Sequence, residues 1–435
     1  MVFITFFESV EADNIRRLTV PRQKGSRALN LHDESDERPS LTPSERRASL
    51  SIAALYSLRM MGLFLVLPVL ALHAQELSGA TPFLMGLAVG IYGLTQAVFQ
   101  IPLGALSDRI GRKPIVTAGL IIFCIGSAWA AMAGSAMTLV MARALQGAGA
   151  ISGTLNAFLA DLTRASQRTK AMAIVGVSIG GSFAIALAAG PVLSALVGVN
   201  GLFSLTAVMA LLGIPLLWSI PTGQTSVEAR PAQQRTIGLK QILRDPTLLR
   251  LDLGVFMLHM ILTASFVAVP LVLAQDLNYP APQHWRVYLP AVLLGFVTMV
   301  PFIMTTSRGH GDRIFLGSIA VLALSLFLMA GGHLEFWVLA TALWIFFTAF
   351  NLLEASLPAL VSRAAPGEAK GMALGVYATT QFLGAFCGGV LGGFLLGHAP
   401  PFVVFITLGT LTVVWFGVSW PLLQNASERT AVDPQ

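Results

Sequence analysis

Twelve long apolar segments follow one another between residues 50 and 422, and no other feature restricts the fold of this chain as strongly. They cover residues 50–75, 83–105, 115–134, 137–161, 171–198, 202–220, 250–275, 287–306, 313–331, 335–361, 370–397 and 401–422. A helix that crosses the hydrocarbon core of a bilayer needs about 20 apolar residues. We therefore predict twelve transmembrane helices, with both termini on the same side of the membrane.

The composition excludes a soluble protein. Hydrophobic residues make up 55% of the chain and charged residues 11%, with a mean hydropathy of +0.74, whereas a soluble domain carries about 25% charged residues. Cys124 and Cys387 both fall inside apolar segments, which favours buried thiols over a disulfide or a metal site. The sequence has no phosphate loop and no Ser/His/Asp set, so we do not expect an enzyme. The net charge of +6 comes from basic residues that set the orientation of a membrane protein, so we expect no nucleic-acid partner.

Basic residues separate between the two sets of connecting loops. One set carries clusters at residues 109–113, 164–170, 230–244, 308–313 and 363–370. The other set contains only Arg286. The positive-inside rule places the first set, and with it both termini, in the cytoplasm.

The chain divides into five parts. Residues 1–49 hold 8 of the 27 Lys and Arg residues with little periodicity, and we predict a disordered cytoplasmic tail. Residues 50–220 and 250–422 each hold six of the predicted helices. The linker at 221–249 is polar and basic, and we predict in it a short amphipathic helix on the membrane surface. Residues 423–435 form a second cytoplasmic tail.

The two groups of six helices resemble each other at an offset near 200 residues. Residues 63–68 (Leu-Phe-Leu-Val-Leu-Pro) correspond to 265–270 (Ser-Phe-Val-Ala-Val-Pro), and residues 170–173 (Lys-Ala-Met-Ala) correspond to 370–373 (Lys-Gly-Met-Ala). Such a parallel internal repeat predicts two related six-helix bundles.

The loop between the second and third predicted helices is the densest charge cluster between residues 60 and 160. Gly104 allows another helix to approach closely, Asp108 can face the positive end of a helix, and Arg112 can bind a carboxylate with two hydrogen bonds. The loop closely resembles the signature loop of the major facilitator superfamily, through Gly104, Asp108, Arg109, Gly111, Arg112 and Lys113.

This resemblance implies an all-α membrane protein whose twelve transmembrane helices form two six-helix, pseudo-symmetric bundles. It implies that the protein moves a solute by alternating access. It also implies that Asp108 lies against the start of the eleventh helix, near residues 367–371, and that Arg112 pairs with Asp161 at the end of the fourth. These contacts would hold the bundles together on the cytoplasmic side while a cavity opens outward.

Other segments are similar to the drug/proton antiporter branch of that superfamily. Residues 143–147 (Arg-Ala-Leu-Gln-Gly) resemble a motif of proton-coupled members, and Gly190 and Pro191 belong to an antiporter-like motif in the fifth helix. Residues 59–68 and 351–358 resemble bacterial inner-membrane members that carry a small soluble domain after the twelfth helix. We expect that domain to be absent here.

Four titratable residues lie well inside predicted helices, and an ionised group in lipid is functional by default. They are Arg59, Arg143, His259 and Glu354, in the first, fourth, seventh and tenth helices, which line the central cavity in the family that the chain resembles. Each alone could instead be a satisfied structural group. The amides of Gln146, Asn351 and Gln381 either join this proton and substrate cavity or hold helices together.

Glu354 is the leading candidate for the proton carrier, because removal from water favours the protonated form of a carboxylate. Arg59 is its first candidate partner. At 1.5 Å per residue, Arg59 lies about 13 Å and Glu354 about 10 Å from the cytoplasmic ends of their predicted helices.

We therefore expect a secondary active transporter of a bacterial inner membrane that exports a small organic compound in exchange for protons. The expected partners are that compound, protons and the lipid bilayer, with the proton gradient in place of a cofactor and a monomer as the functional unit. A passive facilitator and a non-transporting membrane sensor remain as alternatives, because the sequence does not identify a substrate.

Overall fold

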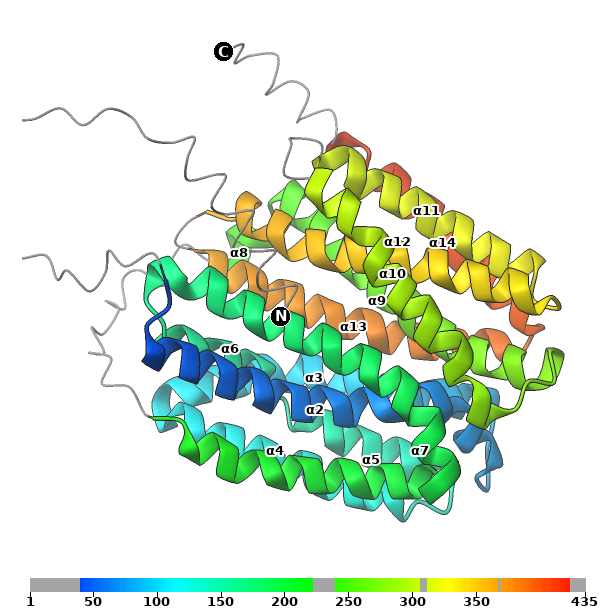
Figure 1. The fold of residues 1–435 in the computed structure, drawn as a ribbon, viewed down its shortest axis with the longest axis horizontal. Helices are drawn as coiled ribbons and strands as arrows, with labels where there is room; N and C mark the ends of the chain where they lie inside the picture. The colour runs from blue at the N-terminus through cyan, green and yellow to red at the C-terminus, as the bar shows by residue number, and fades with distance from the viewer. Residues whose placement is uncertain (1–39, 222–238, 306–310, 367–368, 423–435) are drawn as a thin grey trace, which may run out of the picture. The chain divides into compact units, whose positions relative to one another are not determined.

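The computed structural model describes residues 40–221, 239–305, 311–366 and 369–422. Its helices are α2 (Pro43–Glu76), α3 (Pro82–Ile110), α4 (Arg112–Ala131), α5 (Ala136–Ala148), α6 (Ser152–Asp161), α7 (Arg168–Ser219), α8 (Leu239–Ile242), α9 (Pro246–Leu271), α10 (Trp285–Thr305), α11 (Gly311–Gly331), α12 (Phe336–Ala364), α13 (Lys370–Leu396) and α14 (Pro401–Ser419) (Figure 1). Short helical turns occur at Ala165–Gln167, Val272–Asp276 and Ala281–Gln283.

Ten of the helices in these ranges are long and apolar enough to cross a membrane. One of them, α7, is two helices, because Gly198 has a φ of 69° that interrupts the helical conformation. α5 and α6 are each too short to span, but they follow one another across a break at residues 149–151 and together form one more span. The described residues thus hold the twelve spans that the sequence predicts.

The first helix begins earlier than predicted, at Pro43 rather than at residue 50. The Thr42 hydroxyl accepts a hydrogen bond from the Glu45 backbone N–H, and the Glu45 carboxylate accepts one from the Thr42 N–H, at 3.2 and 2.8 Å. This reciprocal arrangement is a capping box, and Pro43 is suited to the first helical position. Residues 1–39 and 423–435 of the predicted tails lie outside the described residues.

The predicted linker is described only in part, because residues 222–238 lie outside the described ranges. The single turn of α8 follows them, and Ile242 within it is buried. Asp245 then caps α9 by accepting hydrogen bonds from the backbone N–H groups of residues 247 and 248. The seventh span therefore starts at Pro246, four residues before its predicted start.

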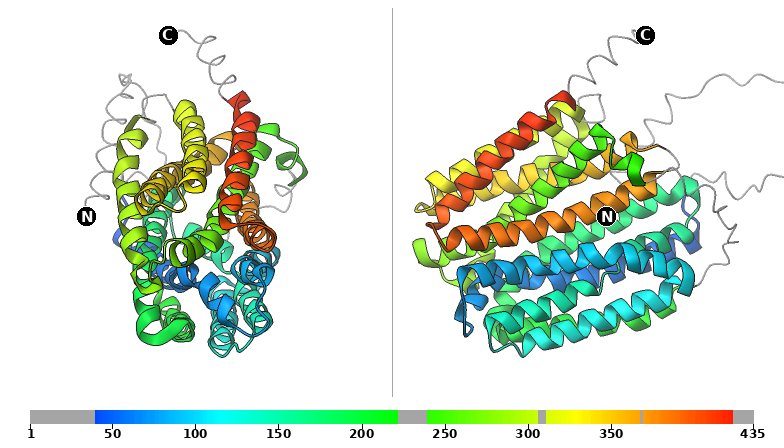
Figure 2. Two further views of the ribbon diagram at one scale, coloured as in Figure 1. Left: turned by 90° about the vertical axis from the view of Figure 1, so that its right-hand side faces the viewer. Right: turned by 180° about the vertical axis from the view of Figure 1, so that it is seen from behind.

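The helices pack in two groups. In the first half (α2–α7), α2 and α4 pack on α7, and α3 packs on α5; in the second half (α9–α14), α9 packs on α13, α11 on α14, and α10 on α12. The halves meet through α3 with α13, α7 with α10, and α2 with α9. Figure 2 shows α13, in orange, next to the blue and cyan helices of the first half.

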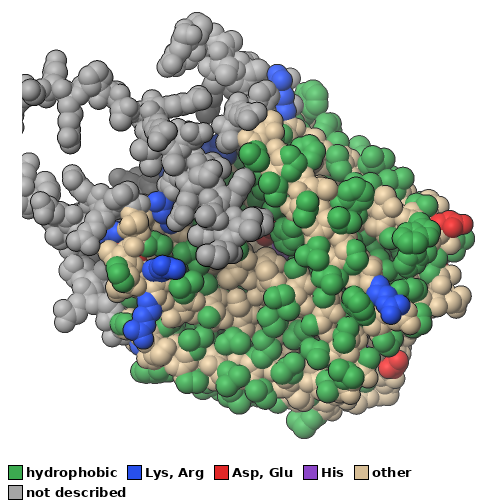
Figure 3. All heavy atoms as spheres, in the orientation of Figure 1, with side chains coloured by type: hydrophobic (Ala, Val, Ile, Leu, Met, Phe, Trp, Pro, Cys, Tyr) green, Lys and Arg blue, Asp and Glu red, His purple; other side chains and the backbone are tan. Residues whose placement is uncertain are grey.

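The loops define two ends, which we name by their residues. Among the described residues, the basic end holds the connections at 110–112, 162–167, 220–221, 239–245, 365–366 and 369, and the far end holds those at 77–81, 132–135, 277–284 and 397–400. At the far end, Ser78 hydrogen-bonds to Gly134, and Gln275 of one half donates to Gln75 of the other. Figure 3 shows hydrophobic side chains over most of one face and Lys and Arg gathered toward its left end.

Glycines bring α3 and α13 into backbone contact near the far end. A Cβ on Gly86 would collide with the backbone of Gly389 and Gly393, and a Cβ on Gly90 would collide with that of Phe386. Small residues spaced four apart lie on one helix face and let two backbones touch. We call this contact the glycine crossing.

The same two helix faces are open toward the basic end. Gly104 lies 18 residues after Gly86, and Gly371 and Gly375 lie 18 residues before Gly389 and Gly393, a spacing of about five turns that returns to the same face. A Cβ at any of these three positions would meet nothing within 4 Å. α3 and α13 are therefore in backbone contact near the far end and apart at these three positions, and between the two regions Gln100 of α3 still donates to the Thr379 hydroxyl of α13 at 2.9 Å.

Candidate functional site

The charged segment 104–113, predicted as a loop, is helical except at Gly111 and contains the tight turn between two long helices. α3 ends at Ile110 and α4 begins at Arg112, so Gly111 alone connects them. Gly111 has a φ of 107°, a conformation that side-chain-bearing residues rarely adopt. The second glycine of the motif is therefore required by the backbone of the turn.

Arg112 joins this turn to the end of the fourth span, as predicted. Its Nε lies 2.8 Å from Oδ2 of Asp161, the last residue of α6. Its Nη1 lies 2.6 Å from Oδ1 of Asp108 and 2.6 Å from the Ser107 hydroxyl. One guanidinium thus connects the loop motif with α6.

Lys113 and Arg109 differ in their surroundings. The Lys113 ammonium donates to the Ile220 carbonyl oxygen at 2.6 Å and lies 5.5 Å from the Trp218 ring centre, so it binds the C-terminal end of α7. A cation is favourable at that end of a helix dipole. Arg109 is exposed at the surface of the loop.

The predicted contact of Asp108 with the start of the eleventh helix is not tested by this structure. Within the described ranges, Asp108 pairs with Arg112, and its side chain is 47% exposed. Residues 367–368 lie outside those ranges, and α3 and α13 are apart at this end. The contact remains a prediction for a conformation in which the basic end is closed.

The predicted pair of Arg59 and Glu354 does not form. Arg59 is only 1% exposed and donates to the Ser152 hydroxyl, the Gly149 carbonyl oxygen and the Gln96 side chain at 2.9, 3.0 and 2.8 Å. The depth estimate was wrong because both helices are longer at the basic end than predicted. Arg59 lies sixteen residues after Pro43, about 24 Å, whereas Glu354 lies ten residues before Ala364, about 15 Å.

Arg143 is also buried between helices of the first half. Its Nη1 donates to the Gln146 side chain at 2.7 Å, and Gln146 donates in turn to the Ser127 hydroxyl at 2.7 Å. The guanidinium lies 5.2 Å from the Tyr92 ring centre. Arg59, Arg143 and Gln146 therefore connect α5 and α6 to α2, α3 and α4, in the protein interior rather than on an open cavity wall.

Three predicted residues of the second half come together from three helices. His259 Nε2 of α9 lies 3.7 Å from Glu354 Oε2 of α12, and the Gln381 amide of α13 lies 2.7 Å from the same nitrogen. His259 Nδ1 lies 3.2 Å from the Val255 carbonyl oxygen. With the Gln381 amide nitrogen as donor, Nε2 accepts that hydrogen bond and Nδ1 donates to the Val255 carbonyl oxygen.

The Glu354 carboxylate is partly exposed and only partly paired. Its side chain is 39% exposed, and Oε2 has no hydrogen-bond partner in the described part of the chain. Asn351 lies one turn earlier on α12, is buried, and has an amide nitrogen without a hydrogen-bond partner there. The sequence thus placed Glu354 correctly beside a group of the seventh helix, but chose the wrong first partner.

Close packing of α9 on α13 brings a second carboxylate near this group. Gly384 and Gly388 of α13 face the backbone of Phe256 and Met260 of α9. Closer to the basic end, Tyr377 of α13 and Asp252 of α9 are both buried, each 6% exposed.

Sequence reasoning missed Asp252 and Tyr377. Asp252 is 6% exposed, yet it seemed to lie at the edge of a span predicted to begin at residue 250. Asp245 followed by Pro246 is a recognisable helix start and would have shown that Asp252 lies within the helix.

The antiporter-like motif of α7 contributes to packing. A Cβ on Gly190 would collide with the Leu65 carbonyl oxygen of α2. α7 continues as a helix through Pro191. The motif therefore lets α7 approach α2 closely.

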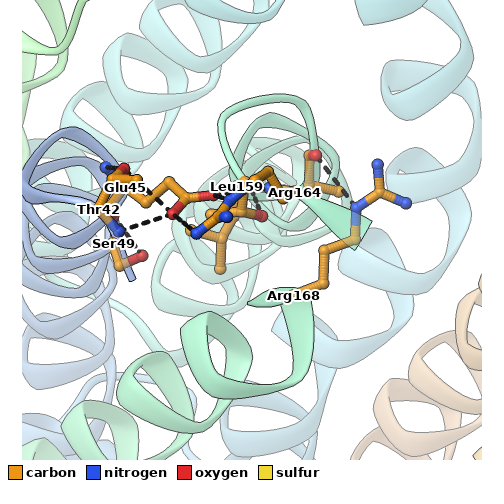
Figure 4. Close-up of polar contacts among 8 residues, drawn as sticks. Thr42, Glu45, Ser49, Leu159, Arg164 and Arg168 are labelled. Atoms are coloured by element: carbon orange, nitrogen blue, oxygen red, sulfur yellow. Dashed lines mark hydrogen bonds and ion pairs between the residues drawn. The ribbon is translucent and has the colours of Figure 1, made fainter. Parts of the chain in front are cut away.

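Glu45 is a further charged residue that the sequence reasoning left in the N-terminal tail. Its carboxylate accepts from Arg164 Nε at 2.9 Å, from Arg164 Nη2 at 3.0 Å and from the Arg164 backbone N–H at 2.9 Å (Figure 4). Arg168, four residues on, donates to the Ala160 carbonyl oxygen at 3.3 Å. The start of α2 is thereby joined to the loop that follows Asp161.

A family model described as Major Facilitator Superfamily matches residues 52–386 and, in a second alignment, residues 251–434. The chain belongs to the Major Facilitator Superfamily. Inner membrane transport protein YajR of Escherichia coli K12 is 44% identical over 381 residues, which cover 87% of this chain and 84% of YajR. Multidrug resistance protein MdtH of Yersinia enterocolitica is 25% identical over 85% of this chain and 93% of MdtH.

Solved structures of the superfamily share the fold. The nucleoside transporter NupG, in its D323A mutant, has a TM-score of 0.70 at 14% identity and covers 86% of this chain and 99% of its own. The human organic anion transporter MFSD10 has a TM-score of 0.64 at 17% identity, with 87% and 100% covered. The chain is thus a multi-pass inner-membrane member of the Major Facilitator Superfamily, whose relatives are transporters rather than enzymes.

Proposed function

We propose that this protein exports a small organic compound in exchange for protons, by alternating access. The observation that supports this most is the Glu354 carboxylate, which lies inside a membrane-spanning helix, 3.7 Å from His259, without a basic partner in the described residues other than that imidazole. An intramembrane carboxylate that is not neutralised by a salt bridge is costly unless it serves a function such as proton transfer. The similarity to the multidrug resistance protein MdtH supports the outward direction of transport.

The separation of α3 and α13 at the basic end supports alternating access. We place that end, both termini and the linker in the cytoplasm, because the positive-inside rule favours that orientation. The described conformation is then open to the cytoplasm and closed at the glycine crossing.

Proton movement supplies the energy in this scheme. One proton crossing 100 mV supplies about 2.3 kcal/mol. A proton that binds Glu354 removes the negative charge beside His259, and so changes the relative free energy of the two conformations. The protein would work as a monomer with no organic cofactor.

The test uses cells that lack the gene, complemented with the wild-type chain or with Glu354→Gln, grown against a panel of amphipathic compounds. When only the cells with the wild-type chain tolerate a compound, transport of that compound is measured in proteoliposomes with an imposed pH gradient. Glu354→Gln should abolish uphill transport but keep exchange of the compound, because exchange needs no net proton movement. Glu335→Gln, at the other end of α12, is the matched control.

Uphill transport by Glu354→Gln would contradict the proposed role of this carboxylate. Flux of the compound through the wild-type protein that does not depend on the pH gradient would identify a passive facilitator. The absence of flux for every compound that binds would favour a membrane sensor.

A further inference from the structure

A buried ion pair joins the first helix to the loop after the fourth span. The side chains of Glu45 and Arg164 are only 7% and 17% exposed. Nε and Nη2 of Arg164 donate to the two different carboxylate oxygens of Glu45, at 2.9 and 3.0 Å. Two parallel hydrogen bonds of this kind are among the strongest contacts that arginine makes with a carboxylate. Burial of both charges also costs solvation, so stability alone does not explain the pair.

The start of α2 does not depend on Arg164. Oε2 of Glu45 accepts hydrogen bonds from the Thr42 backbone N–H at 2.8 Å and from the Thr42 hydroxyl at 3.1 Å. Figure 4 shows Thr42 and Arg164 on opposite sides of the Glu45 carboxylate. A negative charge is favourable in the first turn of a helix, and a glutamine at this position would keep the capping box. The ion pair therefore fixes the arginine more than it fixes the helix that carries the glutamate.

The end of the fourth span explains why the position of Arg164 matters. α6 ends with Asp161, and a carboxylate is unfavourable at the negative end of a helix dipole. Arg112 compensates this charge at 2.8 Å, and the same guanidinium contacts Asp108 at 2.6 Å. Asp161 is also the acidic residue nearest to Arg164 in the sequence, only three positions away. Two arginines can therefore compete for one carboxylate.

We propose that Glu45 is a positioning residue, which holds Arg164 away from Asp161 and so reserves Asp161 for Arg112. The ion pairs at the basic end, within the described ranges, follow this division: Arg164 with Glu45, and Arg112 with Asp161 and Asp108. This inference rests on the alternating access of the proposed function. When the basic end closes, Asp108 leaves Arg112 for the start of α13, and Asp161 remains as the partner of Arg112.

Loss of the Glu45 charge changes this division. Arg164 then pairs with Asp161, and Arg112 keeps Asp108 as its carboxylate partner. Asp108 stays at Arg112 instead of reaching α13, and the basic end remains open. Loss of the Arg164 charge has no such effect, because Asp161 still binds Arg112. The two members of the ion pair therefore have unequal effects on closure, whereas in a purely structural pair either loss has the same effect.

The test measures closure directly and needs no knowledge of the substrate. Spin labels are placed on Leu106→Cys and Met372→Cys in the full-length protein without its native cysteines, in lipid nanodiscs. Glu45→Gln should lower the population of short distances about 2- to 5-fold, which corresponds to the contribution of a partly exposed ion pair. Arg164→Gln should leave this population unchanged. The double variant Glu45→Gln/Arg164→Gln should restore the wild-type distribution, because the competing cation is absent.

The outcomes distinguish positioning from a structural effect. An equal loss of short distances in Glu45→Gln and Arg164→Gln identifies a purely structural pair and overturns the positioning role. A wild-type distribution in Glu45→Gln overturns it as well, and both results leave the proposed function intact. If the wild-type protein shows no short distances at acidic or neutral pH, alternating access is contradicted together with this inference. Thermal unfolding of each variant checks that it is folded.

Discussion

The guanidinium of Arg59 lies 3.0 Å from the carbonyl oxygen of Gly149, at the point where the fourth span breaks between α5 and α6. The break frees carbonyl groups at the end of α5, where the helix dipole is negative and a cation is stabilised. Arg59 of the first helix therefore donates to a carbonyl group that the break in the fourth span leaves without a helical partner.

Replacement of Arg59 by methionine should destabilise the protein. It would leave several buried acceptors unpaired, and each costs about 1–3 kcal/mol. Thermal unfolding in detergent, followed by tryptophan fluorescence, should show a clear drop in the transition temperature. Arg286→Met, in the first turn of α10 at the far end, is the control and should unfold like the wild-type protein. If Arg59→Met and the wild-type protein had the same transition temperature, the Gly149 carbonyl group would not need this partner.

Asp108→Asn should reduce transport without reducing the amount of protein in the membrane. The carboxylate is exposed here and pairs with Arg112, so its loss costs little in this conformation, since exposed ion pairs contribute about 0–1 kcal/mol. Its larger effect is expected where the basic end closes on the start of α13.

The distance between spin labels at residues 106 and 372 measures this closure. Asp108→Asn should show a smaller population of short distances than the wild-type protein. Asp312→Asn, in the first turn of α11, is the control. A distance distribution unchanged by Asp108→Asn would remove the proposed contact.

Gly389→Val should weaken the contact between the halves, whereas Gly371→Val should not. The two glycines lie on the same face of α13, about five turns apart. Only at residue 389 would a Cβ collide with the backbone of α3. Overpacking of this kind costs about 1–3 kcal/mol. Thermal stability and the yield of folded protein in gel filtration give the comparison, and equal loss in both variants would contradict the glycine crossing.

The orientation is testable by labelling single cysteines in a background without Cys124 and Cys387. Ser78→Cys should react with a membrane-impermeant maleimide added to intact cells, because we place the far end outside. Ser226→Cys, in the linker segment outside the described residues, should react only after the cells are opened. The opposite result would reverse the proposed topology.

The spans and the charged loop were predictable because both depend on simple physical rules. Apolar length is set by the thickness of the bilayer, and loop charge is set by insertion. The Arg112–Asp161 pair was predicted from family resemblance, since nothing in the sequence alone links two residues that lie 49 positions apart.

The rotation of helices about their axes was not predictable. A helix that is hydrophobic on every side shows no face in its sequence, so the direction of Arg59 could not be read. The missing helix starts were readable, in contrast. Thr42-Pro43-Ser44-Glu45 is a capping-box sequence with proline at the first position, and its recognition would have corrected the depth of Arg59 and removed Glu45 from the tail.

The pairing of Glu45 with Arg164 can form only after the ribosome has synthesised the residues between them. The two residues are 119 positions apart in the chain. At about 5–20 residues per second, the ribosome needs roughly 6–24 s to reach Arg164 after adding Glu45. Until then, the Glu45 carboxylate can accept hydrogen bonds from Thr42 but not from Arg164. The opening helix of the protein is therefore completed by a residue made after the fourth span.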